Sequence, residues 1–160
     1  MSSLVIAPDD PARADVTALL QRHAEFALKE SPPDTCHFLD VEALKTPDIT
    51  FWSAREGDAL QGVVALKTLD DSSGEIKSMH VAQAARGKGA GQALMAHLIN
   101  EARSRNYRTL WLETGNTEGF QSALRLYKRL GFEACPPFGC YKETDFNVFM
   151  TLDLEADHAA

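Results

Sequence analysis

The sequence contains few cysteines, no long apolar run and no excess of positive charge. Its cysteines, Cys36, Cys135 and Cys140, are odd in number and include no C-x-x-C pair, which argues against a disulfide framework and against a zinc ribbon. We therefore expect reduced thiols and no metal site. No stretch approaches the ~18 apolar residues of a membrane span, and the first residues lack the basic start and apolar run of a signal peptide. These absences predict a cytoplasmic protein.

The charge balance excludes a further class of partner. The chain has 16 Lys and Arg against 23 Asp and Glu, so its formal net charge is −7. General nucleic-acid binders normally carry a basic domain, so nucleic acid is not an expected partner. A membrane is not expected either, because no apolar span is present. A length of 160 residues with a hydrophobic share of 44% predicts one folded domain over residues 1–160.

Hydrophobic periodicity predicts alternating strands and helices. Helical spacing of apolar residues covers 12–28, about 90–105 and 118–130, and residues 40–45 add a helical turn. Apolar runs bounded by turn residues predict strands at 3–7, 49–55, 60–69, 75–81, 109–114, 132–135 and 146–154. The interleaving favours a mixed α/β class with a central sheet, and the tail 155–160 is expected to fray.

The most informative feature is the glycine-rich turn Arg86–Gly91, which joins a predicted strand to an amphipathic helix. Glycines let backbone N–H groups converge on an anion, and the helix dipole adds positive potential there, so the turn indicates a phosphate site. A nucleotide-binding P-loop would need glycine at position 82, where this sequence has Ala82, and serine or threonine at position 89, where it has Gly89. The P-loop motif is therefore not matched. A dinucleotide fingerprint would need a third glycine at Gln92. A helix entry without any ligand is the alternative interpretation.

Three segments together resemble the GNAT family of N-acetyltransferases. Arg86-x-x-Gly89-x-Gly91 matches the family's Q/R-x-x-G-x-G/A signature, and EIKSMHV (75–81) stands where its fourth strand stands. ALRLYKRLGF (123–132) is similar to its A-x-x-L-Y-x-x-x-G-F segment, and the likeness is strong over about residues 60–135. The resemblance implies a strongly twisted mixed sheet of about six to seven strands, flanked by about four helices and splayed after its fourth strand.

The same resemblance implies an acetyl-CoA site in two parts. Backbone groups of Met79, His80 and Val81, near a bulge in the fourth strand, would pair with the pantetheine arm of the cofactor. The pyrophosphate would be held by backbone amides of Arg86, Gly87, Lys88, Gly89, Ala90 and Gly91, with Gln92 following.

Two residues are candidates for the catalytic acid and base. An amine with a pKa near ~10.4 is mostly protonated at neutral pH, so acetyl transfer to it benefits from a general base. Glu75, 11 positions before Arg86, matches the catalytic glutamate of the family's histone-type branch; a solvated strand-edge carboxylate is the alternative, and Glu113 is a rival. Tyr127 falls on the family's general-acid tyrosine, which would protonate the departing thiolate; a ring packed in the core is the alternative.

The resemblance also indicates where an acceptor would bind. Its cleft would be built from aromatic and histidine residues that could equally cap the core, namely Phe26, His37, Phe38, Phe138 and Tyr141. Residues 86–129 hold eight Lys and Arg against three Glu, a balance of +5 on the cofactor segment, and both flanking segments are acidic. Acidic flanks would attract a cationic amine.

We therefore expect an acetyl-CoA-dependent N-acetyltransferase that moves an acetyl group to a primary amine of a small molecule or peptide, by direct transfer in a ternary complex. A coenzyme A-binding module without transfer activity is the alternative, and a nucleotide-binding domain is disfavoured by the failed motifs. Because many GNAT enzymes dimerise, a homodimer stays an open alternative.

Overall fold

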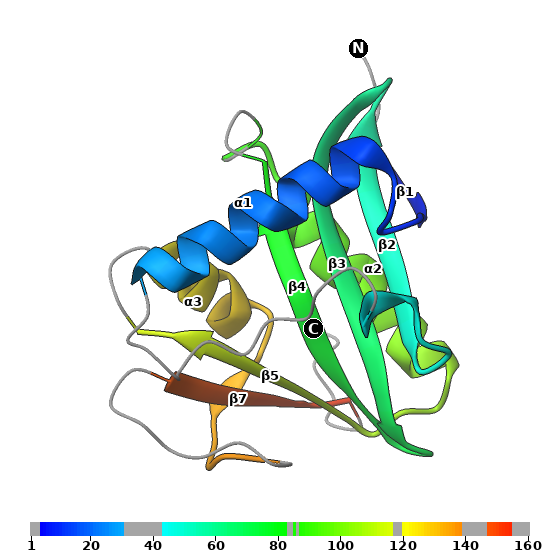
Figure 1. Ribbon diagram of the computed structural model, residues 1–160. Coiled ribbons are helices and arrows are strands. Elements are labelled where there is room, and N and C mark those ends of the chain that lie inside the picture. Colours follow the sequence, from blue (N-terminus) through cyan, green and yellow to red (C-terminus); the bar gives the residue numbers. More distant parts are fainter. Residues whose placement is uncertain are drawn as a thin grey trace.

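The computed structural model describes residues 4–30, 43–82, 85, 87–116, 120–138 and 147–154. Strands and helices alternate along the chain as the periodicity predicts (Figure 1). The elements are β1 (Leu4–Pro8), α1 (Ala14–Glu30), the 3-10 turn η1 (Ala43–Lys45), β2 (Ile49–Glu56), β3 (Ala59–Asp70), β4 (Ser73–Val81), α2 (Ala90–Ser104), β5 (Thr109–Gly115), α3 (Gln121–Arg129), β6 (Glu133–Ala134) and β7 (Asn147–Asp153). The predicted tail 155–160 lies outside the described residues.

The seven strands form one mixed sheet in the order β1-β2-β3-β4-β5-β7-β6. Neighbouring strands are antiparallel except β4 and β5, which are parallel and are connected through α2. The mixed α/β class is therefore confirmed. Within the described ranges, no helix is both long enough and apolar enough to cross a membrane.

The sheet opens between its two parallel strands. The β4–β5 ladder pairs Ser73–Ile76 with Thr109–Leu112 and ends there, although β4 continues to Val81 and β5 to Gly115. Figure 1 shows the two strands diverging as the arms of a V, with α1 in front of the sheet and α2 behind it. We call this opening the fork; it is the splay that the resemblance implies after the fourth strand.

A bulge in β4 lies in the diverging part of the strand. Val63 of β3 pairs with His80 and Ala65 pairs with Lys77, so Ser78 and Met79 together oppose one residue of β3. Ser78 has a φ of 56°, in the left-handed region that few non-glycine residues adopt. A bulge inserts one residue and so shifts the alternation of faces along the strand.

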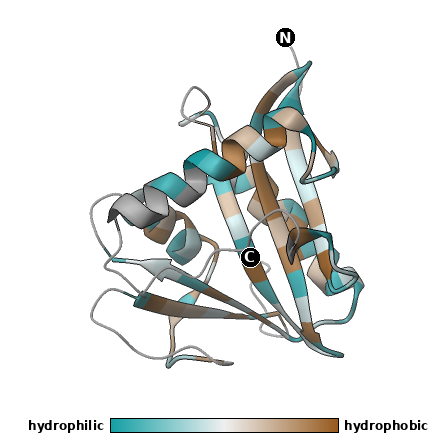
Figure 2. Ribbon diagram, in the orientation of Figure 1, coloured by the Kyte–Doolittle hydropathy of each residue, from teal (hydrophilic) through white to brown (hydrophobic). Residues whose placement is uncertain are grey.

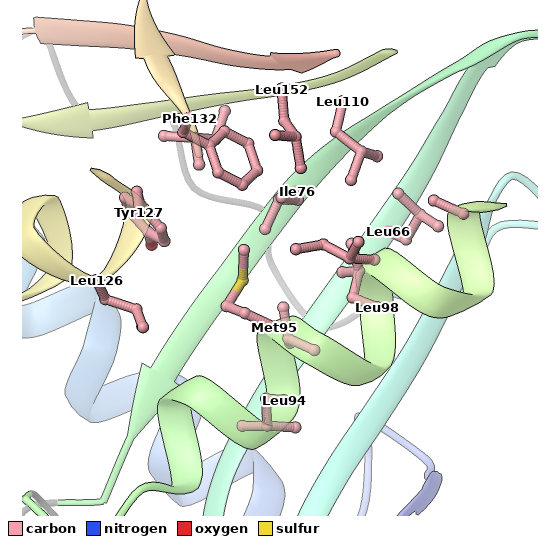
Figure 3. Packing of buried hydrophobic residues seen from close by; sticks show 14 of the residues in the cluster. Leu66, Ile76, Leu94, Met95, Leu98, Leu110, Leu126, Tyr127, Phe132 and Leu152 are labelled. Atoms are coloured by element: carbon pink, nitrogen blue, oxygen red, sulfur yellow. The ribbon is translucent and has the colours of Figure 1, made fainter. Parts of the chain in front are cut away.

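Two hydrophobic clusters cover the two faces of the sheet. The larger one joins residues of the central strands to α2 and α3 (Figure 3), and includes Ile76, Leu94, Met95, Leu98, Leu110, Leu112, Leu126, Met150 and Leu152. The smaller one joins α1 to β2 and β3 through Val16, Leu19, Leu20, Leu44, Phe51, Val63 and Ala65. Figure 2 shows hydrophilic residues along the middle of α1 and hydrophobic ones along β3 behind it. Burial of these apolar side chains is what holds the helices to the sheet.

The alternation of side chains assigns the polar residues near the fork to one face. Ile76, Leu110, Leu112 and Met150 point into the larger cluster with α2 and α3. Successive strand residues point to opposite faces. Glu75 and Lys77 of β4, Trp111 and Glu113 of β5 and Phe149 of β7 therefore lie on the face that α1 covers.

Candidate active site

The glycine-rich turn adopts the conformation that a phosphate site needs. Gly87 has a φ of 80° and Gly89 a φ of 89°, and no heavy atom lies within 4 Å of where a Cβ would stand at either residue. The backbone conformation, rather than crowding, therefore favours glycine here. Gly89 is the N-cap of α2 and makes no side-chain cap hydrogen bond, and Lys88 beside it is exposed. The N-terminal amides, the helix dipole and Lys88 all suit an anion.

The first turn of α2 packs directly against β4 and α3. A Cβ built on Gly91 would lie 3.3 Å from Cγ2 of Val81 and 3.5 Å from both Cε of Met79 and Cδ2 of Leu126. The glycine-rich turn, the bulged end of β4 and the residue before Tyr127 therefore meet in one place. Figures 1 and 3 both place α3 at the open side of the fork. Arg86, the first residue of the signature, lies outside the described residues.

Tyr127 combines a packed ring with a buried hydroxyl. Its side chain is only 6% exposed, and the ring centroid lies 6.0 Å from that of Phe132 (Figure 3). Within the described part of the chain, the Tyr127 hydroxyl has no hydrogen-bond partner, and burial raises its pKa to about 12. A buried hydroxyl without a partner costs about 1–3 kcal/mol. A ligand atom with a lone pair at this position would satisfy it.

Glu75 is buried, so the alternative of a solvated strand-edge carboxylate is wrong. Its exposed fraction is 4%, and its Oε2 lies 2.9 Å from Nζ of Lys77, whose side chain is 9% exposed. It pairs with Trp111 across the β4–β5 ladder, one rung before the ladder ends. The carboxylate is thus held at the base of the fork by a local ion pair.

Glu113 stands at the other side of the same opening. It is the first residue of β5 beyond the end of the β4–β5 ladder, and it is half-buried. Its Oε2 accepts a hydrogen bond from Nδ2 of Asn147, a buried residue of β7. Two carboxylates, Glu75 and Glu113, therefore flank the start of the fork on the α1 face.

Of the predicted acceptor residues, Phe138 is the one whose side chain the structure describes. Its ring lies 5.3 Å from Trp111 and 5.8 Å from Phe149, between ring centroids. Phe26 belongs to α1, but its side chain lies outside the described part. The remaining predicted residues outside the described part are His37, Phe38 and Tyr141.

Several residues at this site were missed by sequence reasoning, above all Lys77, Trp111 and Asn147. The alternation in TLWLET could have found Trp111, because inward-facing Leu110 and Leu112 place it on the same face as Glu113. No local pattern points to Asn147, since its contact with Glu113 depends on the β5–β7 pairing of segments 34 residues apart.

Comparison with known proteins identifies the family. A model of the Acetyltransferase (GNAT) family matches residues 14–132. The chain is 44% identical over 146 residues to the uncharacterized N-acetyltransferase YsnE of Bacillus subtilis, covering 91% of this chain and 97% of that protein.

Solved structures show the same fold. A Klebsiella pneumoniae protein assigned as an acyl-CoA N-acyltransferase matches with a TM-score of 0.75 and 26% identity, over 94% of this chain and 97% of that one. A GNAT family acetyltransferase from Elizabethkingia anophelis with acetyl-CoA bound matches with a TM-score of 0.65 and 19% identity, over the same shares of the two chains. The matched family model and the relative that covers nearly the whole chain show that this protein belongs to the acetyltransferase (GNAT) family.

Proposed function

We propose that this protein transfers the acetyl group of acetyl-CoA to a primary amine of a small molecule or peptide, directly and within a ternary complex. The observation that carries the proposal is the convergence of three segments: the start of α2 at Gly89, the bulged end of β4, and α3 at Leu126, the residue before the buried Tyr127. The fold relative with bound acetyl-CoA supports the choice of donor.

The cofactor-binding groups would act in two sets. Backbone amides of residues 87–92, with Lys88 and Arg86 beside them, would bind the pyrophosphate, since N–H groups in the first turn of a helix have no intrahelical acceptor. Backbone groups of Met79, His80 and Val81 would bind the pantetheine arm, because β5 does not continue its ladder with β4 beyond Ile76. When bound, acetyl-CoA supplies an activated acetyl thioester.

Tyr127 would act as the general acid. Its raised pKa keeps the hydroxyl protonated at neutral pH, so it holds a proton that it can donate from Oη to the sulfur that leaves the acetyl group. The surrounding apolar cluster excludes water and disfavours an uncompensated thiolate, which favours this donation.

The base would be one of the two carboxylates on the α1 face, directly or through water. Glu75 could accept the amine proton at Oε2 only in competition with its ion pair to Lys77. Glu113 lies beyond the end of the ladder, is half-buried and is oriented by the neutral amide of Asn147. Because Glu113 lies beyond the ladder and is more exposed than Glu75, we take Glu113 as the proton acceptor and Glu75 as a charged group that positions the site.

A panel of primary amines, screened for free thiol released from acetyl-CoA, tests the proposal. We expect turnover with at least one class of amine, a loss of at least tenfold in Glu113→Gln, and a smaller loss in Glu75→Gln. The reverse order would assign the base to Glu75. If acetyl-CoA stabilises the protein against heat but no amine releases thiol, the protein is a coenzyme A-binding module instead.

A further inference from the structure

Three aromatic side chains from β5, β7 and the segment after β6 form a connected group on the α1 face. The rings of Trp111 and Phe138 lie 5.3 Å apart with an interplanar angle of 32°, and those of Phe138 and Phe149 lie 5.8 Å apart at 88°. Phe149 is 4% exposed, whereas Trp111 and Phe138 are only half-buried. The buried ring of Phe149 thus supports Phe138, which in turn contacts Trp111, and the latter two rings keep part of their surface accessible.

The aromatic group lies beside both carboxylates of the fork. Trp111 pairs with Glu75 across the β4–β5 ladder, and Phe149 pairs with Glu113 across the β5–β7 ladder. Adjacent strands are about 4.8 Å apart, and two residues along a strand span about 6.7 Å. The Cα atoms of Trp111 and Glu113 are therefore about 6.7 Å apart with their side chains on the same face, a spacing that a two-carbon spacer and a carboxylate side chain suit.

An aromatic ring held in place by its neighbours, such as that of Trp111, favours a planar aromatic ligand. Offset stacking and edge-to-face contacts form between aromatic rings and not with puckered aliphatic rings of similar size. Because Trp111 is already held by Phe138, little side-chain freedom is lost when a ligand stacks on it. An acceptor with an aromatic ring near its amine gains this contact, whereas an aliphatic amine of equal volume gains only apolar burial.

We propose that the acceptor is an amine carried on a short spacer from a planar aromatic ring, and that Trp111 is a specificity-determining residue that stacks on that ring. The proposal rests on the proposed N-acetyltransferase function. In this arrangement the ring lies against Trp111 and Phe138, and the amine points along β5 toward Glu113.

A matched pair of acceptors tests the proposal, 2-phenylethylamine and 2-cyclohexylethylamine, which share the spacer and the amine and differ in ring planarity. We expect kcat/KM for the aromatic amine to exceed that for the cyclohexyl amine by about tenfold. Trp111→Leu should lower the value for the aromatic amine about tenfold more than that for the cyclohexyl amine, and Trp111→Phe should retain much of the preference. Leu69→Ala, at an exposed position of β3, is the control and should leave the ratio unchanged.

A binding measurement makes the test independent of turnover. The chain has two tryptophans, and the other, Trp52, is 3% exposed, so acrylamide should quench mainly Trp111. In the presence of coenzyme A, 2-phenylethylamine should protect Trp111 from the quencher and the cyclohexyl amine should protect it less.

Equal kcat/KM and equal protection of Trp111 by the two amines would overturn the proposal. An equal loss of kcat/KM for both amines in Trp111→Leu would also overturn it, because the three aromatic rings would then only support the β5–β7 pair. Thiol release from other amines without an aromatic preference would leave the transferase function standing and refute this inference alone. If 2-phenylethylamine protects Trp111 but no amine releases thiol, the aromatic binding site stands and the transferase function is refuted.

Discussion

Replacing Tyr127 by phenylalanine removes one oxygen atom and separates stability from catalysis. The wild-type hydroxyl is buried without a described hydrogen-bond partner, so its removal relieves an unfavourable desolvation instead of breaking a bond. We expect the variant to be as stable as the wild type or more stable by about 1 kcal/mol. For a domain of this size that corresponds to a melting temperature about 2–4 °C higher.

Turnover should change in the opposite direction. Loss of a positioned general acid typically costs about 10²–10⁴-fold, or about 2.7–5.4 kcal/mol of transition-state stabilisation. The affinity for acetyl-CoA should change by less than about threefold, because a single buried hydroxyl contributes little to the ground-state complex. Thiol release measured at saturating acetyl-CoA gives kcat, and thermal unfolding of the ligand-free protein gives the stability.

The pH dependence has a defined sign. Burial raises the pKa of Tyr127 from its ordinary value of 10.0 to about 12, so its protonated form gives stability that is fully present below pH 10 and is lost as pH rises through 12. Phenylalanine does not titrate, so the stability advantage of the variant should widen between pH 10 and 12. Denaturant titrations of both proteins across this range measure the difference.

Tyr107→Phe is the matched control. Tyr107 is also buried, at 8% exposure, but its hydroxyl lies 2.7 Å from Oγ1 of Thr68. Removing that hydroxyl should destabilise the protein by about 1 kcal/mol and leave turnover unchanged. If Tyr127→Phe is destabilised in the same way, its hydroxyl has a structural partner; if its kcat equals that of the wild type, the acid role is refuted.

Three further substitutions test the glycine turn, the packing of β4 and the attachment of β1. Gly89→Asp should weaken acetyl-CoA binding at least tenfold in a calorimetric titration. Gly89→Asn, whose side chain tolerates the same positive φ, should weaken binding much less. Equal losses in the two variants would mean that charge at position 89 does not affect binding. Gly74→Ala should lower the free energy of unfolding by about 1–3 kcal/mol, because its Cβ would stand 2.7 Å from a buried leucine of β3, and a change below 0.5 kcal/mol would contradict this packing. Arg55→Met should cost about 1.5–3 kcal/mol at pH 7, because it removes the guanidinium that bonds Asp9 and Asp15 and leaves Asp9 with only Arg13 and Ser53 as described side-chain partners. A hydrogen bond from Arg55 also lowers the pKa of Asp15 below 3.8, so the stability that this bond provides is present above pH ~4 and is lost as pH falls through the folded-state pKa. A difference in the free energy of unfolding between wild type and variant that stays constant down to pH ~2 would refute this pH dependence.

The periodicity of apolar residues within short segments was sufficient to predict most of the helices and strands. The apolar stripe of α2 and the alternation in β5 each depend on residues within one element, and the strands and helices form within one to three residues of their predicted ends. The beginning of α3 falls three residues later than predicted, next to residues 117–119, which are not described. The family signature likewise combines residues close in sequence, and membership in the GNAT family is confirmed.

The catalytic and cofactor residues were named by resemblance, and their roles stay predictions. Their surroundings depend on contacts between distant segments that no local period encodes. A carboxylate that follows a glycine gave no sign that Glu75 would be buried against Lys77. The burial of the Tyr127 hydroxyl depends on how α3 packs against distant segments, and not on its neighbours in sequence.

The amino-acid sequence alone was thus enough to predict the order of strands and helices, the glycine-rich turn and the family. These features depend on short-range periodicity and backbone requirements, which are properties of contiguous residues. The pairing of Glu113 with Asn147, the aromatic group of Trp111, Phe138 and Phe149, and the face on which both carboxylates lie were decided by the tertiary structure. The reason is physical: sheet pairing brings β5 and β7 together across more than 30 residues, and a one-residue change of register would move the strand side chains among them to the opposite face.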